Sequence, residues 1–288
     1  MPGLGDALVR EEPAAGQRRG DAAPGYTLFG ETPGVDGRRV ADGRAASVSV
    51  LKFGSSVLAC PRDYLRVADA LGARVAMGSR IVAVVSAMEG QTDALLSAAR
   101  SVSPESADAL VGALLATGEE ASVALLVLAL AGRGVRAEGF NASRLPILTR
   151  GALDDAEPIG VDAARLRTAL QRSDVVVFPG FVGVDVTGVP SLLGRGGSDL
   201  TALFLGHALG DAEVCLVKDV DGVYPADPRT NPGIAAYEEM DWSEAIRVGG
   251  EIVQGKAVEF AQRHRMRFRV AGMGGRGTWV GRVGGGAG

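Results

Sequence analysis

The sequence predicts an α/β fold: an open, mainly parallel sheet with helices on both faces. Short and continuously apolar segments, such as 81–85 and 175–178, are typical of strands buried on both faces. Helical patterns alternate with these strands along the chain, which is typical of parallel sheets. Ligands of such sheets bind at the carboxyl ends of the strands, so we expect the chemistry in the loops that follow them.

The elements follow from local patterns. In the first half we expect a strand at 48–53, a helix from Pro61 with apolar residues at Tyr64, Val67, Ala68 and Leu71, a strand at 81–85, a helix from about Thr92, and a long helix over 106–130 interrupted by Gly118. In the second half we expect short strands at 136–140 and near Ile147, a helix at 161–170, a strand at 175–178, a helix at 200–209, a strand at 214–218, helices at 243–248 and 253–264, and a last strand at 267–270.

The composition indicates a globular protein that acts on small molecules. The chain has 288 residues, of which 47% are hydrophobic, and its formal charge of −4 offers no basic surface for nucleic acid or anionic lipid. The most apolar run, around 121–131, is about half the length that crosses a bilayer, and the N-terminus shows no apolar signal core. Only Cys60 and Cys215 are present, which fits a reducing compartment better than a disulfide between them. We therefore expect a cytoplasmic protein with no membrane or nucleic-acid partner.

Both ends of the chain differ from the middle. Residues 1–46 are rich in Gly, Pro, Ala, Arg and Asp and lack a sustained period, so we expect a flexible tail, with a partner-binding arm as the alternative. The glycine-rich end, 273–288, is also expected to be flexible. At the start of this end, the GxGxxG pattern at 272–277 has no sizeable helix after it and does not indicate a dinucleotide site.

The segment Gly194-Arg195-Gly196-Gly197-Ser198-Asp199, followed by an apolar helix, is suited to an anionic ligand. Glycines let a backbone approach a ligand closely, and Ser198 or Asp199 can cap a helix whose first amides point at an anion. Arg195 can grip a carboxylate or phosphate at two points. This segment is therefore expected to form part of a site.

Four further motifs accompany this segment in a fixed order. They are Lys52-Phe53-Gly54-Ser55-Ser56, VSAMEGQTDAL at 85–95, Pro179-Gly180-Phe181, and KDVDGVY at 218–224 followed by ADPR at 226–229. Over about 48–270 the chain resembles the catalytic domain of aspartokinases, in the amino acid kinase superfamily. The resemblance implies a three-layer α/β/α sandwich around an open, mainly parallel sheet, the amino acid kinase fold, as one domain at 47–272. It also implies transfer of the ATP γ-phosphoryl group to the side-chain carboxylate of aspartate, with Mg²⁺, by a homodimer.

Phosphoryl transfer depends mostly on positioning and charge neutralisation. Lys52 is suited to neutralising the β- and γ-phosphates, and the resemblance places the family's phosphate-binding lysine there. Asp199 is the acid expected to organise the reacting groups through a lysine or metal-bound water; no metal-ligand cluster stands out in the sequence. Gly54, Ser55 and Ser56 are expected beside the nucleotide phosphates, although Ser55 replaces a glycine that the family usually has.

An amino acid substrate needs a cation for its α-carboxylate and an acceptor for its α-ammonium group. Arg195 and Glu119 supply these two groups. By resemblance the substrate site comprises Ser86, Thr92, Glu119, Phe181, Arg195 and Ser198. Glu120 stands where many relatives have arginine, which changes the charge expected near the pocket.

The nucleotide is expected to lie along 218–229. A backbone at a strand end can hydrogen-bond adenine, an aromatic ring can pack on the base or ribose, and charged side chains can reach ribose and phosphates. The residues expected there are Lys218, Asp219, Tyr224, Asp227 and Arg229, with Lys256 as a further phosphate ligand. Lys218 replaces a frequent serine or threonine of the family.

Glu251 is the main departure from the family, which has a phosphate-binding lysine at this position. A carboxylate reverses the charge where anions bind, so Lys256 is expected to substitute for the missing lysine. Glu120 and Glu251 leave two alternatives open: a kinase for another small acid, and a catalytically weak relative that binds a ligand or a partner subunit. The chain ends soon after the last expected strand, so we expect no regulatory domain in it.

Overall fold

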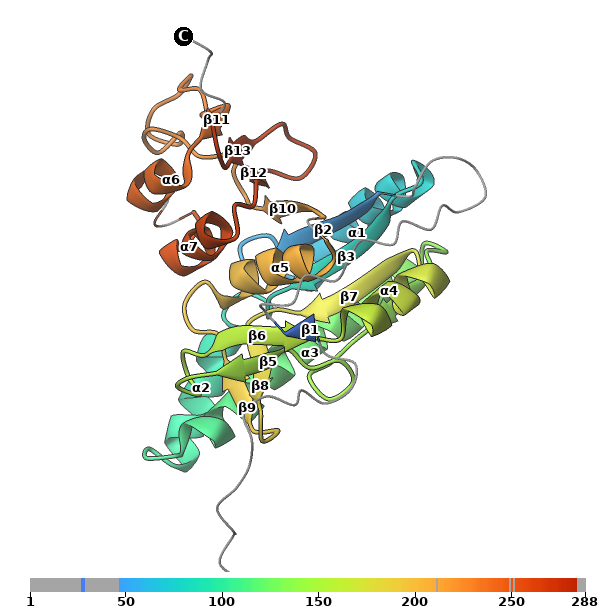
Figure 1. Ribbon diagram of the computed structural model, residues 1–288, viewed down its shortest axis with the longest axis vertical. Coiled ribbons are helices and arrows are strands. Elements are labelled where there is room, and N and C mark those ends of the chain that lie inside the picture. The colour runs from blue at the N-terminus through green and yellow to red at the C-terminus, as the bar shows by residue number, and fades with distance from the viewer. Residues whose placement is uncertain (1–26, 29–46, 211, 249, 251, 284–288) are drawn as a thin grey trace, which may run out of the picture.

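An eight-stranded sheet forms the centre of the computed structural model, which describes residues 27–28, 47–210, 212–248, 250 and 252–283 (Figure 1). The strands, in their order across the sheet, are β11 (Glu239–Met240), β13 (Thr278–Val280), β12 (Phe268–Ala271), β10 (Glu213–Val217), β2 (Val48–Phe53), β3 (Arg80–Val85), β7 (Val175–Pro179) and β4 (Ala137–Gly139). All neighbours are parallel except the pair β12 and β13. The predicted α/β fold is thereby confirmed.

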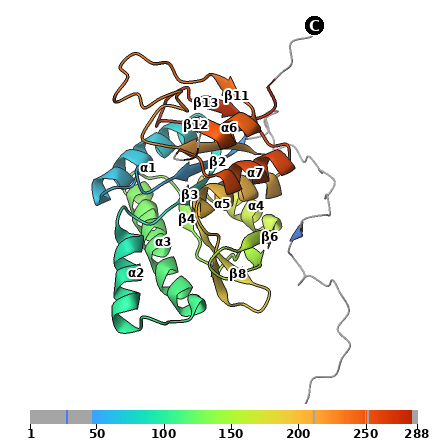
Figure 2. The ribbon, with the colours of Figure 1, turned by 90° about the vertical axis from the view of Figure 1, so that its left-hand side faces the viewer.

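Helices cover both faces of this sheet, as the second view shows (Figure 2). They are α1 (Pro61–Ala76), α2 (Gln91–Val102), α3 (Asp108–Ala131), α4 (Ala163–Arg172), α5 (Gly197–Ala208), α6 (Trp242–Val248) and α7 (Gly255–Arg263). One core joins the sheet to α1 and α3, and the other joins it to α4, α5 and α7. Side chains alternate between the two cores: on β2, Val50 belongs to the α5 side, and Leu51 and Phe53 belong to the α1 side.

A second, five-stranded sheet packs beside α3 and α5. Its order is β1 (Thr27–Leu28), β6 (Glu157–Val161), β5 (Leu148–Arg150), β8 (Val182–Asp185) and β9 (Pro190–Leu192). Leu115 of α3 packs against Val182 and Leu192 of this sheet. The sequence patterns missed four of its strands, because segments of two to five residues show too little alternation to be recognised.

The helix α3 runs through Gly118 without the interruption that was expected. A Cβ at Gly118 would lie 3.1 Å from the Cβ of Ala87 and 3.3 Å from Leu95 Cδ1, so the glycine allows close packing rather than breaking the helix. The 24 residues of α3 are long and apolar enough to cross a membrane by length and composition alone, but half of its most apolar window is buried inside the fold. We therefore interpret α3 as a core helix.

Parts of both predicted flexible ends form strands. Within 1–46, Thr27–Leu28 pairs with β6 as β1, and the rest lies outside the described residues. Within 273–288, the chain turns at Gly277, whose φ is 65°, and returns as β13 along β12, where Thr278 is fully buried. The glycines at 272–277 therefore form a hairpin turn, which explains why no helix follows them.

Candidate active site

Two lysines lie at the carboxyl ends of neighbouring parallel strands. Lys52 is on β2, and Lys218 directly follows β10, whose Val217 pairs with Phe53. Because residues alternate between faces, Lys52 and Lys218 both lie on the side of the sheet that α5 covers. The site thus begins with two ammonium groups at one edge of the sheet, as expected for a ligand of a parallel sheet.

Asp199 lies between these lysines, in the first turn of α5. Its Oδ1 is 2.8 Å from Lys52 Nζ and its Oδ2 is 2.9 Å from Lys218 Nζ, and the carboxylate is only 3% exposed. Burial alone would raise the pKa of Asp199, but the two lysines outweigh it and hold that pKa below its usual value. The N-terminus of α5 further favours the anion.

This cluster carries two positive charges and one negative charge on its three side chains. The lowered pKa of Asp199 makes it a poor proton acceptor, so its chemistry is to hold the two lysines in place. Burial lowers the pKa of Lys218, and repulsion by Lys52 adds to this effect. Two ammonium groups held at one point form a site that attracts an anion with several charged oxygens, such as a polyphosphate.

The glycine loop before α5 has the expected glycine conformations, but neither Ser198 nor Asp199 caps the helix as predicted, because α5 already begins at Gly197 with Gly196 as its N-cap and no side-chain cap hydrogen bond. Gly194 and Gly196 have φ angles of 69° and 79°, which glycine adopts without strain. A Cβ at Gly194 would lie 1.9 Å from Asp155 Oδ1, and one at Gly196 would lie 2.4 Å from Gln254 Cβ. Between them Arg195 is exposed, and none of the described residues pairs with its guanidinium group. The loop thus presents a cation that no described residue pairs with, directly before α5, the helix that carries Asp199.

Phe181 has a φ of 69°, which is uncommon for a residue with a side chain. Its N–H donates to Thr201 Oγ1 on α5 at 3.1 Å, and Thr201 Oγ1 donates to the Gly197 carbonyl at 2.9 Å. A Cβ at Gly197 would come within 2.9 Å of the Phe181 ring. Backbone strain of this kind concentrates at functional sites, and here the strained residue Phe181 lies against the start of α5.

Glu119 is a buried acid on α3, with 3% of its surface exposed. Burial raises the pKa of Glu119 to about 8, although a backbone hydrogen bond from Ala87 and the charge of Lys52 oppose the rise. Its Oε2 atom is buried without a hydrogen-bond partner among the described residues. A buried carboxyl group whose Oε2 can still accept a hydrogen bond is suited to binding a cationic group of a ligand.

Ser86 joins the loop after β3 to α5. Its Oγ donates to Ser198 Oγ at 3.0 Å, and Ser198 is nine-tenths buried. Thr92 lies in the first turn of α2, which follows the same loop, and is half-buried. The structure therefore brings together the ends of β2, β3, β7 and β10 with the first turn of α5, where most of the expected substrate residues stand.

The expected nucleotide segment, 218–229, is largely exposed beyond Lys218. Asp219 is exposed, Tyr224 donates to the Asp221 carbonyl at 3.4 Å, and Asp227 Oδ1 accepts from Arg229 Nε at 3.2 Å. Gly54 is buried in the turn after β2, where a Cβ would lie 2.9 Å from Lys52 Nζ, and the adjacent Ser55 and Ser56 are exposed. The exposed residues of these two stretches follow β2 and β10, the strands at whose ends the two lysines lie.

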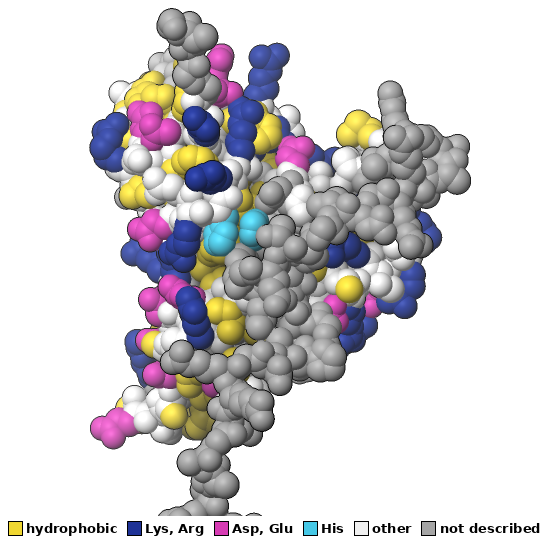
Figure 3. Space-filling model, viewed as in Figure 1, with side chains coloured by type: hydrophobic (Ala, Val, Ile, Leu, Met, Phe, Trp, Pro, Cys, Tyr) yellow, Lys and Arg dark blue, Asp and Glu magenta, His cyan; other side chains and the backbone are white. Residues whose placement is uncertain are grey.

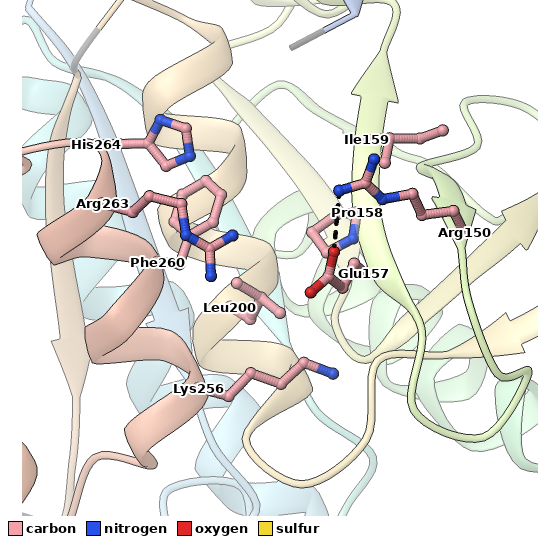
Figure 4. Close-up of a pocket in the computed structure, with 9 residues that line it drawn as sticks. All are labelled: Arg150, Glu157, Pro158, Ile159, Leu200, Lys256, Phe260, Arg263 and His264. Atoms are coloured by element: carbon pink, nitrogen blue, oxygen red, sulfur yellow. Dashed lines mark hydrogen bonds and ion pairs between the residues drawn. The ribbon is translucent and has the colours of Figure 1, made fainter.

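Lys256 lies at a cavity of about 400 Å³ between α7 and the second sheet, lined by Arg150, Glu157, Pro158, Ile159, Leu200, Lys256, Phe260, Arg263 and His264 (Figure 4). Its Nζ is 2.6 Å from Asp155 Oδ1 and donates to the carbonyls of Leu193 and Ala156 at 2.9 and 3.1 Å. The two histidines, with rings 4.6 Å apart, lie on this face of the molecule beside Lys and Arg side chains (Figure 3). The ammonium group of Lys256 is thus occupied away from Asp199. Glu251 lies outside the described residues.

The described residues include no group of three His, Cys, Asp or Glu side chains that could hold a metal ion. The buried carboxylate at the centre, Asp199, is already paired on both oxygens. Among the residues that the structure describes, the acid at the centre of the site therefore serves the two lysines.

Sequence patterns missed one ion pair in this site and one hydrogen bond in the interior. They assigned Lys218 to the nucleotide alone, whereas it also pairs with Asp199. They treated Tyr64 as one residue of an apolar stripe and did not identify Ser122, although the two hydroxyl groups are hydrogen-bonded in the interior. The available signal was a tyrosine on a buried helix face and a serine one helical turn after Glu119.

The chain is similar in sequence to a known family and to several known proteins. Residues 47–272 match the model of the amino acid kinase family. An aspartate kinase of Pseudomonas putida is 34% identical over 224 residues, which cover 77% of this chain and 54% of the relative. An aspartokinase of Mycolicibacterium smegmatis is 37% identical over 230 residues, covering 77% and 53% respectively. The chain thus spans about half the length of the curated relatives that it matches.

Solved structures show the same fold. The aspartate kinase from Synechocystis superposes with a TM-score of 0.70 and 27% identity, covering 84% of this chain and 40% of that one. E. coli aspartokinase III, solved in complex with aspartate and ADP, gives a TM-score of 0.69 and 25% identity over 83% of this chain and 65% of its own. UMP kinase from Bacillus anthracis, at 16% identity and a TM-score of 0.59, shares the fold alone. Because the family model matches the chain from β2 to β12, this chain belongs to the amino acid kinase family.

Proposed function

We propose that this chain is the catalytic unit of an aspartate kinase, which transfers the γ-phosphoryl group of ATP to the side-chain carboxylate of L-aspartate. The observation that carries the proposal is the pairing of Lys52 and Lys218 with one buried carboxylate, Asp199, at the ends of β2 and β10. Family membership and the names of the 34–37% identical relatives support the choice of aspartate as acceptor.

The chemistry requires no base. An ionised carboxylate oxygen attacks the γ-phosphorus, the bond from that phosphorus to the bridging oxygen breaks, and ADP leaves with the electron pair. Negative charge accumulates on the phosphoryl oxygens, where Lys52 and Lys218 neutralise it, and Asp199 keeps both ammonium groups in place. Mg²⁺ enters as part of MgATP and adds to this neutralisation.

The proposed substrate site lies across the lysine pair from the nucleotide. Arg195 binds the α-carboxylate and Glu119 accepts from the α-ammonium group, with Ser86, Thr92, Phe181 and Ser198 lining the site. The proposed nucleotide residues are Gly54, Ser55, Ser56, Asp219, Tyr224, Asp227 and Arg229. The active unit is proposed to be a homodimer.

The test is ATP consumption with Mg²⁺ and L-aspartate, with the acyl phosphate trapped by hydroxylamine, against a panel of other small carboxylates. A hydroxamate formed from aspartate alone supports the proposal. A hydroxamate formed only from a different acid would show that this acid, and not aspartate, is the substrate. Nucleotide binding with no hydroxamate from any acid would indicate a binding protein instead. Lys52→Ala is expected to lower kcat by at least about 100-fold; a smaller effect would contradict the site assignment.

A further inference from the structure

A chain of hydrogen bonds runs from the interior of the protein to the proposed substrate site. Tyr64, on α1, is 2% exposed, and its hydroxyl group contacts the Oγ of Ser122, on α3, which is fully buried. Ser122 Oγ lies 2.6 Å from the carbonyl oxygen of Ser86. Ser86 Oγ in turn donates to Ser198 Oγ at 3.0 Å. Four elements, α1, α3, the loop after β3 and α5, are therefore joined by hydroxyl groups.

The direction of the two bonds that lead to the Ser86 carbonyl follows from counting hydrogens. A carbonyl oxygen only accepts, so Ser122 donates its one hydroxyl hydrogen to the carbonyl oxygen of Ser86. The hydrogen between Tyr64 and Ser122 must then come from Tyr64, and burial raises the pKa of Tyr64, so the phenol keeps it. Ser86 donates its own hydroxyl hydrogen to Ser198 Oγ. Among the described residues, no acceptor takes the hydrogen of Ser198.

We infer that Tyr64 and Ser122 are positioning residues of the substrate site, which hold the Ser86 peptide so that Ser198 offers its hydroxyl hydrogen to a carboxylate of the acid substrate. The peptide group between Ser86 and Ala87 is held at both of its polar atoms: its carbonyl, from Ser86, accepts from Ser122, and its N–H, from Ala87, donates to Glu119, one turn earlier on the same helix. A displacement of the Ser86 peptide therefore moves the donor at Ser198 and the acceptor at Glu119 together.

This inference rests on the proposed function, but it makes a separate demand on the protein. Neither Tyr64 nor Ser122 is expected to touch a ligand, because both are buried, so their loss affects binding of the acid only through Ser86. Both also lie on the α1 side of the sheet, whereas Lys52, Lys218 and Asp199 lie on the α5 side. Binding of ATP should therefore be insensitive to both residues.

The test is a double-mutant cycle with Tyr64→Phe and Ser122→Ala, in which KM is measured separately for L-aspartate and ATP, and kcat with both saturating. Each single variant is expected to raise KM for aspartate by about threefold to tenfold, with KM for ATP unchanged. Because Tyr64 acts through Ser122, the double variant should match Ser122→Ala alone. Additive effects, equal changes in both KM values, or no change would overturn the inference.

A matched control removes a buried hydroxyl group elsewhere. Ser191→Ala breaks the 2.7 Å contact of Ser191 with Thr149 in the second sheet and should leave KM for aspartate unchanged; an equal rise there would show a merely structural effect and overturn the inference. Calorimetric titration of aspartate into the protein with a non-hydrolysable ATP analogue gives affinities without turnover. If the unaltered chain turns over and the variants behave like it, this inference alone is overturned. If the unaltered chain shows no turnover and binds no acid, the proposed function is overturned together with this inference.

Discussion

Lys218 Nζ lies 2.9 Å from Asp199 Oδ2, on the opposite oxygen from the one that faces Lys52. The sequence holds only three lysines among its 30 Lys and Arg residues, and two of them meet at this carboxylate. Lysine, unlike arginine, presents a compact point charge with a pKa that shifts when it is buried. The arrangement concentrates two such charges where a polyphosphate would be held.

Replacing Lys218 with methionine is expected to lower kcat/KM for ATP by about 10-fold to 100-fold, because one of two phosphate-neutralising charges is lost. Methionine keeps an unbranched side chain, but the variant also leaves one oxygen of Asp199 without its partner. Thermal unfolding should therefore be measured with the kinetics, and Lys218→Arg should recover part of the loss. A kcat/KM unchanged in Lys218→Met would show that Lys218 only supports Asp199.

Amine-reactive labelling offers a second check on the lysine pair. Burial and repulsion by Lys52 lower the pKa of Lys218, so more of its amine is uncharged and reactive near neutral pH than in an exposed lysine. MgATP is expected to protect Lys52 and Lys218 from acetylation, as measured by peptide mass spectrometry. Lys256, held by Asp155, serves as the internal control and should be labelled equally with and without nucleotide. Equal labelling of Lys218 in both conditions would place the phosphates elsewhere.

Much of the main sheet could be predicted from the sequence, because buried strands such as β3 and β7 contain continuous apolar runs and α1 has a clear helical period. The motif residues could be assigned because they follow those strands. The pairing of Lys218 with Asp199 could not, since it depends on the register of β10 against β2 and on where α5 crosses the sheet. The short strands of the second sheet are set by tertiary pairing, which leaves little trace in segments of this length.

The pH dependence of aspartate binding is expected to follow Glu119, whose pKa burial raises to about 8. An ammonium group binds the ionised form, so the affinity for L-aspartate should increase by about tenfold from about pH 6.5 to about pH 8, with release of a proton. Calorimetry in two buffers of different ionisation enthalpy measures that proton. Glu119→Gln should bind more weakly and lose the pH dependence; an unchanged profile in this variant would assign the titration to another group.

The stability of the protein should show the same titration. Between its usual pKa of 4.5 and the raised value, Glu119 keeps its proton in the folded chain and loses it in the unfolded chain. Glu119 therefore destabilises the folded state least at low pH, where the acid is neutral in both states. As the pH rises from about 4.5 to about 8, this group lowers the free energy of unfolding, and above that range its contribution is constant. Denaturant unfolding of the unaltered chain and Glu119→Gln should therefore diverge across this window. Parallel curves would contradict the raised pKa.

Gly196→Ala is expected to destabilise the protein by about 1 to 3 kcal/mol and to abolish most activity. The φ of 79° disfavours a side chain, and the new Cβ would lie 2.4 Å from Gln254 Cβ. The matched control is Gly188→Ala in the turn between β8 and β9, which has a φ of 87° and no atom within 4 Å of the added Cβ. The control shares the backbone cost but not the clash, so activity that falls equally in both variants would rule out a specific role for the loop at Gly196.

Lys256→Met separates two roles for the third lysine. If Lys256 binds the nucleotide, as its position in the sequence suggested, the variant raises KM for ATP. In the structure, the ammonium group of Lys256 instead joins α7 to Asp155 and to the carbonyl of Leu193, the residue before Gly194. Loss of these contacts should displace the neighbouring Arg195. We therefore expect Lys256→Met to raise KM for aspartate by about threefold to tenfold and to leave KM for ATP unchanged. Arg263→Met is the control, because Arg263 lines the same cavity from the same helix and pairs with none of the described residues. A rise in KM for ATP in Lys256→Met, absent from Arg263→Met, would return Lys256 to the nucleotide site and require α7 to move when ATP binds.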